Sequence, residues 1–232
     1  ARNSLIGQFT EKWAKDLLEP IARYYGLFAV NSVICEEIGL PKNSSADLAF
    51  CTTNSICQKP ENIKIIFEIK MSVISNYKYE NGEILYVGDY KSHKGNPALL
   101  RSDSMLKAIG KSINIRVSGI KSTRIPIVIL GNSPITDSYF HKVDYLKTAG
   151  VVQGFWSLNP HPIDSAHIQQ TPKLGFRTIE DINLLRELIG ELLRHEMNYF
   201  SSMISKRKLG EFIRIASQQN SDEEKAEKFL HL

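Results

Sequence analysis

Long hydrophobic runs are missing from this chain of 232 residues. No stretch approaches the roughly 18 to 20 consecutive apolar residues that a membrane-spanning helix needs. The sequence also lacks the charged start followed by an apolar run that is typical of a secretory signal. We therefore expect a cytoplasmic protein without a membrane partner, whose 42% of hydrophobic residues can bury one sizeable core.

Cysteine is scarce as well. Cys35, Cys51 and Cys57 are an odd number and form no CxxC pair, which argues against a disulfide framework or a zinc site. The sequence contains no GxxxxGK, GxGxxG or GxSxG motif, so nothing indicates a nucleotide-phosphate cradle or a hydrolase nucleophile elbow. We expect reduced, inert thiols and look elsewhere for chemistry.

A strong charge of one sign is also lacking, since the net charge is only +4. This mild basic bias permits a polyanionic partner without requiring one. Lysine and arginine gather between Lys91 and Arg124, whereas acidic residues gather near the carboxyl end at 222–227. We therefore expect the middle of the chain to face phosphates.

Hydrophobic periodicity predicts an α/β protein. Apolar residues at helical spacing indicate helices at Leu5–Tyr24 and Ser102–Val117, the second capped by Ser102 or Asp103. Runs rich in valine and isoleucine predict strands. The predicted strands are Leu27–Ile38, Asp47–Thr52, Ile63–Lys70, Ile125–Gly131 and Val151–Leu158.

Beyond these strands we expect a long helix at Ile179–Ile204, a short helix near Leu209–Ala216 and a polar tail. No linker rich in glycine, serine or proline divides the chain. We predict one domain over residues 1–232, with a core at about 1–158, an insertion at 71–101 and a helical carboxyl-terminal region at about 176–232. Its central mixed sheet is expected to be flanked by helices in the order α-β-β-β-α-β.

The insertion contains Asn81-Gly82, a dipeptide that favours the tight turn of a β-hairpin. Pairing across this turn places Tyr77 and Tyr79 on one face with Ile84 and Tyr86, and Lys78 on the other face. Such a β-ribbon can enter the DNA major groove, while a hairpin that only covers the edge of the core is the equal alternative. The residues predicted to bind DNA in and after the ribbon are Tyr77, Lys78, Tyr79, Lys91, His93, Lys94 and Arg101.

Three charged residues carry the predicted chemistry. Asp47 begins one predicted strand, and Glu68 and Lys70 end the next, on the same face because side chains in a strand alternate. Two carboxylates suit Mg²⁺, which prefers oxygen ligands and activates water for phosphodiester hydrolysis. The competing interpretation is an exposed strand end where Glu68 and Lys70 simply pair with each other.

Asp47 followed by Glu68-Ile69-Lys70, within this order of elements, resembles the PD-(D/E)xK nuclease superfamily and in particular type II restriction endonucleases. The resemblance covers roughly residues 1 to 131, and Ala46 stands where the motif has proline. It implies that Asp47, Glu68 and the carbonyl of Ile69 bind Mg²⁺. Lys70 would orient or deprotonate the attacking water, leaving 5′-phosphate and 3′-hydroxyl ends.

The resemblance also implies accessory residues. Many members add a glutamate from the first helix, and Glu11 fits better than Glu19 because it lies beside Leu18 on the helical wheel. Members commonly place a basic side chain of the next helix near the phosphate, where we rank Lys107 above Lys111. Solvated side chains are the alternative for both predictions. If the assignment of Asp47 is wrong, Glu36 or Glu37 is the expected substitute.

The function implied by the resemblance is sequence-specific, Mg²⁺-dependent cleavage of double-stranded DNA by a homodimer. Two-fold symmetry suits the cutting of both strands of a symmetric site, and the predicted helix at Ile179–Ile204 is the expected dimer element. A repair, recombination or transposition nuclease on the same core is the second hypothesis. The third is a non-catalytic DNA-binding protein, which would be expected to lose one of the three charged residues.

Overall fold

The computed structural model describes residues 2–89, 96–158, 168–194 and 206–232. Its centre is a six-stranded mixed sheet with the strand order β1-β2-β3-β6-β7-β8. β1 (Phe28–Val33), β2 (Ala46–Cys51) and β3 (Ile63–Lys70) are antiparallel neighbours. β6 (Ile127–Gly131), β7 (Gly154–Ser157) and β8 (Phe176–Thr178) continue parallel to β3.

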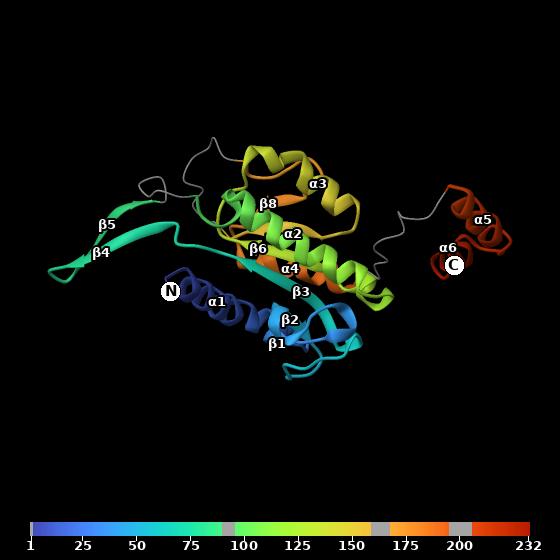
Figure 1. Cartoon of the computed structure of the whole chain (residues 1–232), viewed down its shortest axis with the longest axis horizontal. Helices are drawn as coiled ribbons and strands as arrows, with labels where there is room; N and C mark the ends of the chain where they lie inside the picture. The colour runs from blue at the N-terminus through green and yellow to red at the C-terminus, as the bar shows by residue number, and fades with distance from the viewer. Residues whose placement is uncertain (1, 90–95, 159–167, 195–205) are drawn as a thin grey trace.

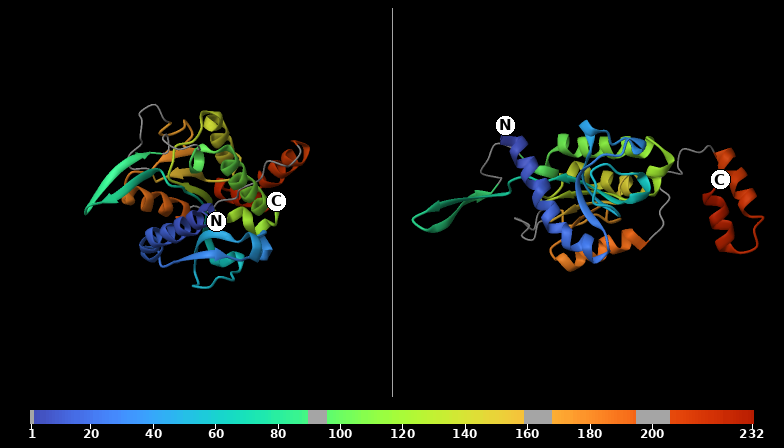
Figure 2. Two further views of the ribbon diagram at one scale, coloured as in Figure 1. Left: turned by 60° about the vertical axis from the view of Figure 1, so that its left-hand side comes forward. Right: turned by 90° about the horizontal axis from the view of Figure 1, so that it is seen from below.

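Helices cover both faces of this sheet and form a three-layer α/β/α arrangement (Figure 1, Figure 2). α1 (Arg2–Tyr24) and α4 (Ile182–Arg194) bury their apolar side chains, among them Leu18 and Ile189, against one face. α2 (Ser102–Val117) and α3 (Phe140–Thr148) pack on the other face. The predicted α/β class, mixed sheet and order α-β-β-β-α-β are therefore confirmed.

Strand β3 has the predicted bounds, Ile63–Lys70. Its apolar residues are buried on both faces of the sheet. Ile65, Phe67 and Ile69 face α1 and α4, while Ile63 and Ile66 belong to the core on the side of α2. The register shifts between Ile63 and Ile65, and from Ile65 onward the side chains alternate, so that the even positions lie on the α2 side toward the carboxyl end of β3.

The predicted strand at Leu27–Ile38 is wrong in its second half. Ser32 has a φ of 54°, in the left-handed region, and β1 ends one residue later at Val33. The N–H of Cys35 then donates to the carbonyl of Leu40, and a short 3₁₀ helix, Glu36–Ile38, lies between them. A valine- and isoleucine-rich composition alone did not reveal this turn.

The inserted hairpin forms as predicted. β4 (Ser75–Glu80) and β5 (Glu83–Asp89) pair across Asn81 and Gly82, whose φ angles of 53° and 84° are both positive, as a type I′ turn requires. Tyr77 lies opposite Tyr86. The ribbon projects away from the sheet (Figure 1, Figure 2), and its apolar side chains are largely exposed, so it does not serve to cover the core edge.

The carboxyl-terminal part differs most from the prediction. β8 and α3 were not predicted. The predicted helix Ile179–Ile204 is α4 between Ile182 and Arg194, and residues 195–204 of that prediction lie outside the described residues. α5 (Lys206–Ala216) starts before the predicted Leu209.

The predicted polar tail is helical in the structure. α6 (Asp222–Leu230) follows α5 and packs against it. The Ser221 hydroxyl accepts a hydrogen bond from the Glu224 N–H, and the Glu224 carboxylate accepts from the Ser221 N–H. This capping box was visible in the sequence as serine followed three residues later by glutamate.

Several smaller predictions can also be compared with the structure. The first residue of α2 is Ser102, but Arg101 occupies the cap position, and no side chain makes a cap hydrogen bond there. All three cysteines are free, with Cys57 exposed. The single-domain assignment stays a prediction.

Arg116 is an exception within the basic segment that we expect to face phosphates. Its guanidinium is buried and donates to the carbonyls of Gly150, Val151, Ser122 and Ile125. It therefore ties the end of α2 to the loops that precede β6 and β7. A buried charge held by several carbonyls is a structural element of the fold.

Replacing Arg116 with methionine should lower the free energy of unfolding by about 2 to 5 kcal/mol, because carbonyls that it satisfies lose their donor inside the protein. Urea unfolding followed by circular dichroism measures this loss. Arg124→Met, at an exposed position, is the control and should change the stability by no more than about 0.5 kcal/mol. Equal effects of the two substitutions would contradict the role assigned to Arg116.

Candidate functional site

The carboxyl end of β3 gathers the charged residues that the sequence singled out. The Lys70 ammonium lies 2.6 Å from Glu68 Oε1 and 3.4 Å from Asp47 Oδ2. The same ammonium donates to the carbonyl of Ile69 at 3.0 Å. All four residues singled out by the motif therefore meet at the Lys70 ammonium.

Asp47 is held by the way the sheet pairs. The β2 to β3 ladder runs from Cys51 to Leu48, which lies opposite Phe67. One residue further, the Asp47 Oδ2 atom accepts a hydrogen bond from the Ile69 N–H at 2.8 Å. The carboxylate thus takes the place of a backbone acceptor where the ladder stops. Glu36 and Glu37, the alternatives to Asp47, are exposed, and Glu37 pairs instead with Lys121.

A fourth charge enters the site from α2. The Lys111 ammonium lies 2.9 Å from Asp47 Oδ1 and 2.6 Å from Glu68 Oε2. The site therefore holds two carboxylates and two ammonium groups, whose side chains are at most 20% exposed. Such balance matters because an unpaired charge at this depth would be costly.

The ranking of Lys107 above Lys111 is wrong. Lys107 is exposed, whereas Lys111 reaches into the site. On α2, Lys111 lies about 40° nearer than Lys107 to the helix face that contacts the sheet. The rotation of the helix decides between them, and nearness to the start of the helix does not.

The two oxygens of Glu68 have different surroundings. Oε1 accepts a hydrogen bond from Lys70. Oε2 is buried and lies 2.6 Å from the Lys111 ammonium, with which it forms an ion pair. Each oxygen of Glu68 thus faces a positive charge, and a carboxylate oxygen can bind a metal cation as well as an ammonium.

The donor set fits a hard divalent cation. Among the residues that the structure describes, no group of three histidine, cysteine, aspartate or glutamate side chains is gathered as a metal site. Mg²⁺ does not need one, since it is usually bound by one or two carboxylates, with water and substrate phosphate completing its shell. Asp47, Glu68 and the Ile69 carbonyl match that chemistry.

The charges in the site perturb one another. Burial raises the pKa of Glu68 above its usual value, and the negative charge of Asp47 raises it further. Burial acts on Asp47 in the same direction, but Lys70, Lys111 and the Ile69 N–H outweigh it and lower the pKa of Asp47. For Lys111, burial is outweighed by the two carboxylates, which raise the pKa of this lysine. At neutral pH, Glu68 is thus the member whose charged form the fold disfavours.

Glu11 lies within electrostatic reach of the cluster. Its side chain is half-buried, and burial followed by the charge of Asp47 raises its pKa. Glu19, the residue that we ranked below it, instead pairs with Arg23 on the surface at 2.9 Å. The preference for Glu11 as the accessory residue agrees with these positions.

The structure does not bring the other predicted DNA-binding residues into the cluster. Tyr77, Lys78 and Tyr79 lie on the exposed ribbon. Arg101 pairs with Asp103 on the surface at 2.7 Å. The remaining candidates, Lys91, His93 and Lys94, lie outside the described residues.

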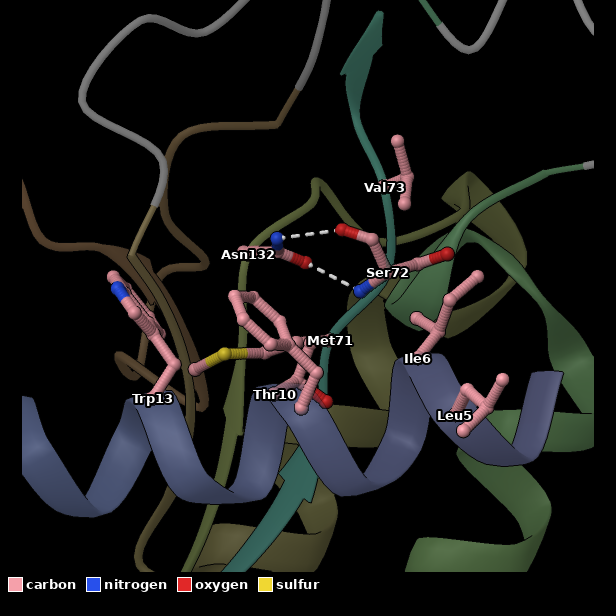
Figure 3. A pocket seen from close by; sticks show the side chains of 9 residues that line it. Leu5, Ile6, Thr10, Trp13, Met71, Ser72, Val73 and Asn132 are labelled. Atoms are coloured by element: carbon pink, nitrogen blue, oxygen red, sulfur yellow. Dashed lines mark hydrogen bonds between the residues drawn. The ribbon is translucent and has the colours of Figure 1, made fainter. Parts of the chain in front are cut away.

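A pocket of about 480 Å³ lies beside the end of β3, between α1 and the segment that follows Lys70 (Figure 3). The side chain of Asn132 exchanges two hydrogen bonds with the backbone of Ser72, at 3.0 and 2.8 Å, and so ties this segment to the end of β6. The walls are mainly apolar, formed by residues such as Ile6 and Met71. Sequence patterns gave no signal for Asn132, whose role depends on β3 and β6 being neighbours.

No protein-family model and no curated protein matches the sequence, and no solved structure matches the fold. Among the described residues, no helix combines the length and apolar character needed to cross a membrane.

The pKa of Asp47 is lowered and that of Glu68 is raised. We therefore expect neutralising substitutions of the two carboxylates to lower the stability by different amounts. Asp47→Asn should lower the free energy of unfolding at pH 7 by about 3 kcal/mol, because it leaves two buried ammonium groups facing one carboxylate. Glu68→Gln should cost less, since it also removes a charge that burial disfavours. Urea unfolding at pH 7 measures both, with the exposed Asp16→Asn as a control.

The pH dependence provides a second check. Because the folded-state pKa of Asp47 is lowered, its contribution is complete above the unfolded pKa and is lost as the pH falls through the folded one. The stability difference between wild type and Asp47→Asn should therefore shrink below about pH 4. A larger cost for Glu68→Gln, or a difference that does not change with pH, would contradict this electrostatic description.

Proposed function

We propose that this protein is a Mg²⁺-dependent endonuclease with a restriction-endonuclease-like core that cleaves double-stranded DNA. The observation that carries the proposal is the convergence of Asp47, Glu68 and Lys70, with Lys111, at one end of the central sheet. The three motif residues lie on neighbouring strands, in the order of elements that the resemblance implies. Simple pairing of Glu68 with Lys70 at an exposed strand end does not describe this buried arrangement.

Each residue has a chemical role in the proposal. Asp47, Glu68 and the Ile69 carbonyl would hold Mg²⁺, which would supply charge stabilisation at the phosphate and make water more acidic. The Lys70 ammonium contacts both carboxylates and the Ile69 carbonyl, so it is placed to orient the attacking water and to balance negative charge on the phosphate. Hydrolysis leaves 5′-phosphate and 3′-hydroxyl ends.

Plasmid cleavage tests the proposal. Supercoiled plasmid incubated with the protein and Mg²⁺ should yield discrete fragments, whereas Ca²⁺ should support binding without cutting. Smears or nicks would instead favour a repair, recombination or transposition nuclease on the same core. Binding without cutting in both ions would indicate a non-catalytic DNA-binding protein and would refute the enzyme proposal.

Lys70→Ala should reduce Mg²⁺-dependent cleavage by about 100-fold or more, because the variant loses the group that orients water and balances phosphate charge. DNA binding in Ca²⁺, measured by gel shift, should persist. Lys78→Ala, an exposed lysine on the ribbon, is the comparison and should retain the cleavage chemistry even if binding weakens. Full activity of Lys70→Ala would show that the motif has been assigned to the wrong residues.

The ribbon is the element that we propose for sequence reading. Tyr77 and Tyr79 are 63% and 75% exposed, and they share a face with Ile84 and Tyr86. On the ribbon, one lysine stands against three acids, Glu80, Glu83 and Asp89. This charge does not favour contacts with phosphates, so the exposed tyrosine face is the feature that carries the proposed contact with base edges.

Tyr79→Ala should weaken binding to a cleavable DNA fragment about tenfold, because the ring is available to stack on a base. The thermal stability should not fall, because the ring is exposed. Val87→Ala, at a position 62% exposed on the opposite face of the ribbon, is the control. Gel shift in Ca²⁺ measures both affinities. Equal affinities for the two variants would remove the reading role from the tyrosine face.

A homodimer completes the proposal, because two-fold symmetry matches cleavage of both strands of a symmetric site. Sedimentation of the DNA-bound protein in Ca²⁺ should give two copies per duplex. One copy per duplex would instead suit a nuclease that cuts the strands independently.

A further inference from the structure

Lys111 occupies the position between the two carboxylates that a divalent cation would use. Its ammonium is 2.9 Å from Asp47 Oδ1 and 2.6 Å from Glu68 Oε2, so that one positive charge contacts both proposed metal ligands. Lys70 contacts the other oxygen of each carboxylate. Two carboxylates and two lysines thus form a closed, neutral cluster.

The two lysines are held in different ways. Lys70 belongs to the same strand as Glu68 and has a third partner, since it also donates to the Ile69 carbonyl. Lys111 comes from a different layer of the fold, at the end of a flexible four-carbon chain, and both contacts of its ammonium are with the two carboxylates. With 17% of its side chain exposed, it has a route out of the site. Of the two, Lys111 is the one whose contacts are entirely replaceable by another cation.

We propose that Lys111 is a built-in competitor of the metal, which neutralises Asp47 and Glu68 in the metal-free protein and leaves them when a divalent cation binds. The inference rests on the proposed function, because it assumes that these carboxylates are the metal ligands. The displaced ammonium lies at the edge of the same site, where a DNA phosphate is its natural new partner.

The alternative is that Lys111 is a fixed structural partner of the carboxylates. In that case its removal would leave two buried carboxylates with one lysine and would disturb the geometry that a metal needs. Metal affinity would then fall or stay unchanged. The competitor model predicts the opposite, since removing a positive charge at about 3 Å makes the carboxylates more attractive to any other cation.

The experiment measures Mn²⁺ affinity without DNA, by titration followed by electron paramagnetic resonance. Lys111→Met and Lys111→Gln remove the charge and should bind Mn²⁺ about tenfold more tightly, or better, than wild type. Lys111→Arg keeps a cation at this position and should bind no more tightly than wild type. Two neutral variants are used so that a folding failure of one, detected by circular dichroism, leaves the other as the test.

Two controls locate the effect. Lys107→Met removes an exposed lysine one turn earlier on α2 and should leave Mn²⁺ affinity unchanged. Adding Asp47→Asn to Lys111→Gln should abolish the gain, because the metal then loses one carboxylate. If Lys107→Met tightens binding as much as the Lys111 variants do, the effect is a general loss of positive charge and the competitor model is wrong.

The outcomes separate this inference from the proposed function. Suppose that Lys111→Met and Lys111→Gln bind Mn²⁺ more tightly than wild type, but that neither wild type nor any variant cleaves DNA in Mg²⁺. The competitor model would then be upheld and the nuclease proposal rejected. Cleavage by wild type with unchanged or weaker Mn²⁺ binding by the neutral variants would overturn the competitor alone. Absence of Mn²⁺ binding in every variant would overturn the competitor model, and absence of cleavage as well would reject the nuclease.

Discussion

The meeting of two carboxylates and two ammonium groups at the end of β3 is the interaction on which this structure depends. Each of the four side chains is mostly buried, and each would be costly without its opposite charges. Removing any one leaves an excess charge among side chains that are at most 20% exposed. The fold must therefore hold β2, β3 and α2 in a fixed relation, and much of the remaining structure serves that requirement.

Three features fix this relation. The Asp47 carboxylate accepts the Ile69 N–H and so extends the pairing of β2 with β3 by one side-chain hydrogen bond. Arg116 lies at the carboxyl end of α2 and anchors this helix to the loops before β6 and β7. Asn132 ties the segment after β3 to the end of β6. Backbone pairing alone would leave the positions of Lys111 and Lys70 less well determined.

The sequence revealed those parts of the site that depend on local periodicity. β3 and α2 have the predicted bounds, because a continuous apolar run and a helical repeat are both local signals. The shared face of Glu68 and Lys70 follows from strand alternation in the same way. The hairpin turn was equally predictable, since Asn81 and Gly82 favour the positive φ angles observed there.

The parts that were missed depend on contacts between distant segments. Lys111 and Lys107 have the same local pattern, and only the rotation of α2 against the sheet brings the first into the site. The early end of β1 depends on the conformation of Ser32, and β8 is only three residues long, too short for a periodic signal. Helix α6 is an exception, because its capping box at Ser221 and Glu224 is a local pattern that could have been recognised in the sequence.

A cluster of equal and opposite charges has two possible meanings, a structural lock or a metal site whose cation is replaced by lysines. The two meanings differ at the buried Glu68 Oε2 atom, whose partner at 2.6 Å is the Lys111 ammonium. Anomalous X-ray scattering from crystals of the protein with DNA and Mn²⁺ distinguishes the two directly. We expect an anomalous peak in contact with Asp47 and Glu68, with the Lys111 ammonium moved toward a phosphate. The four-membered ion cluster intact, with no peak at either carboxylate, would contradict it.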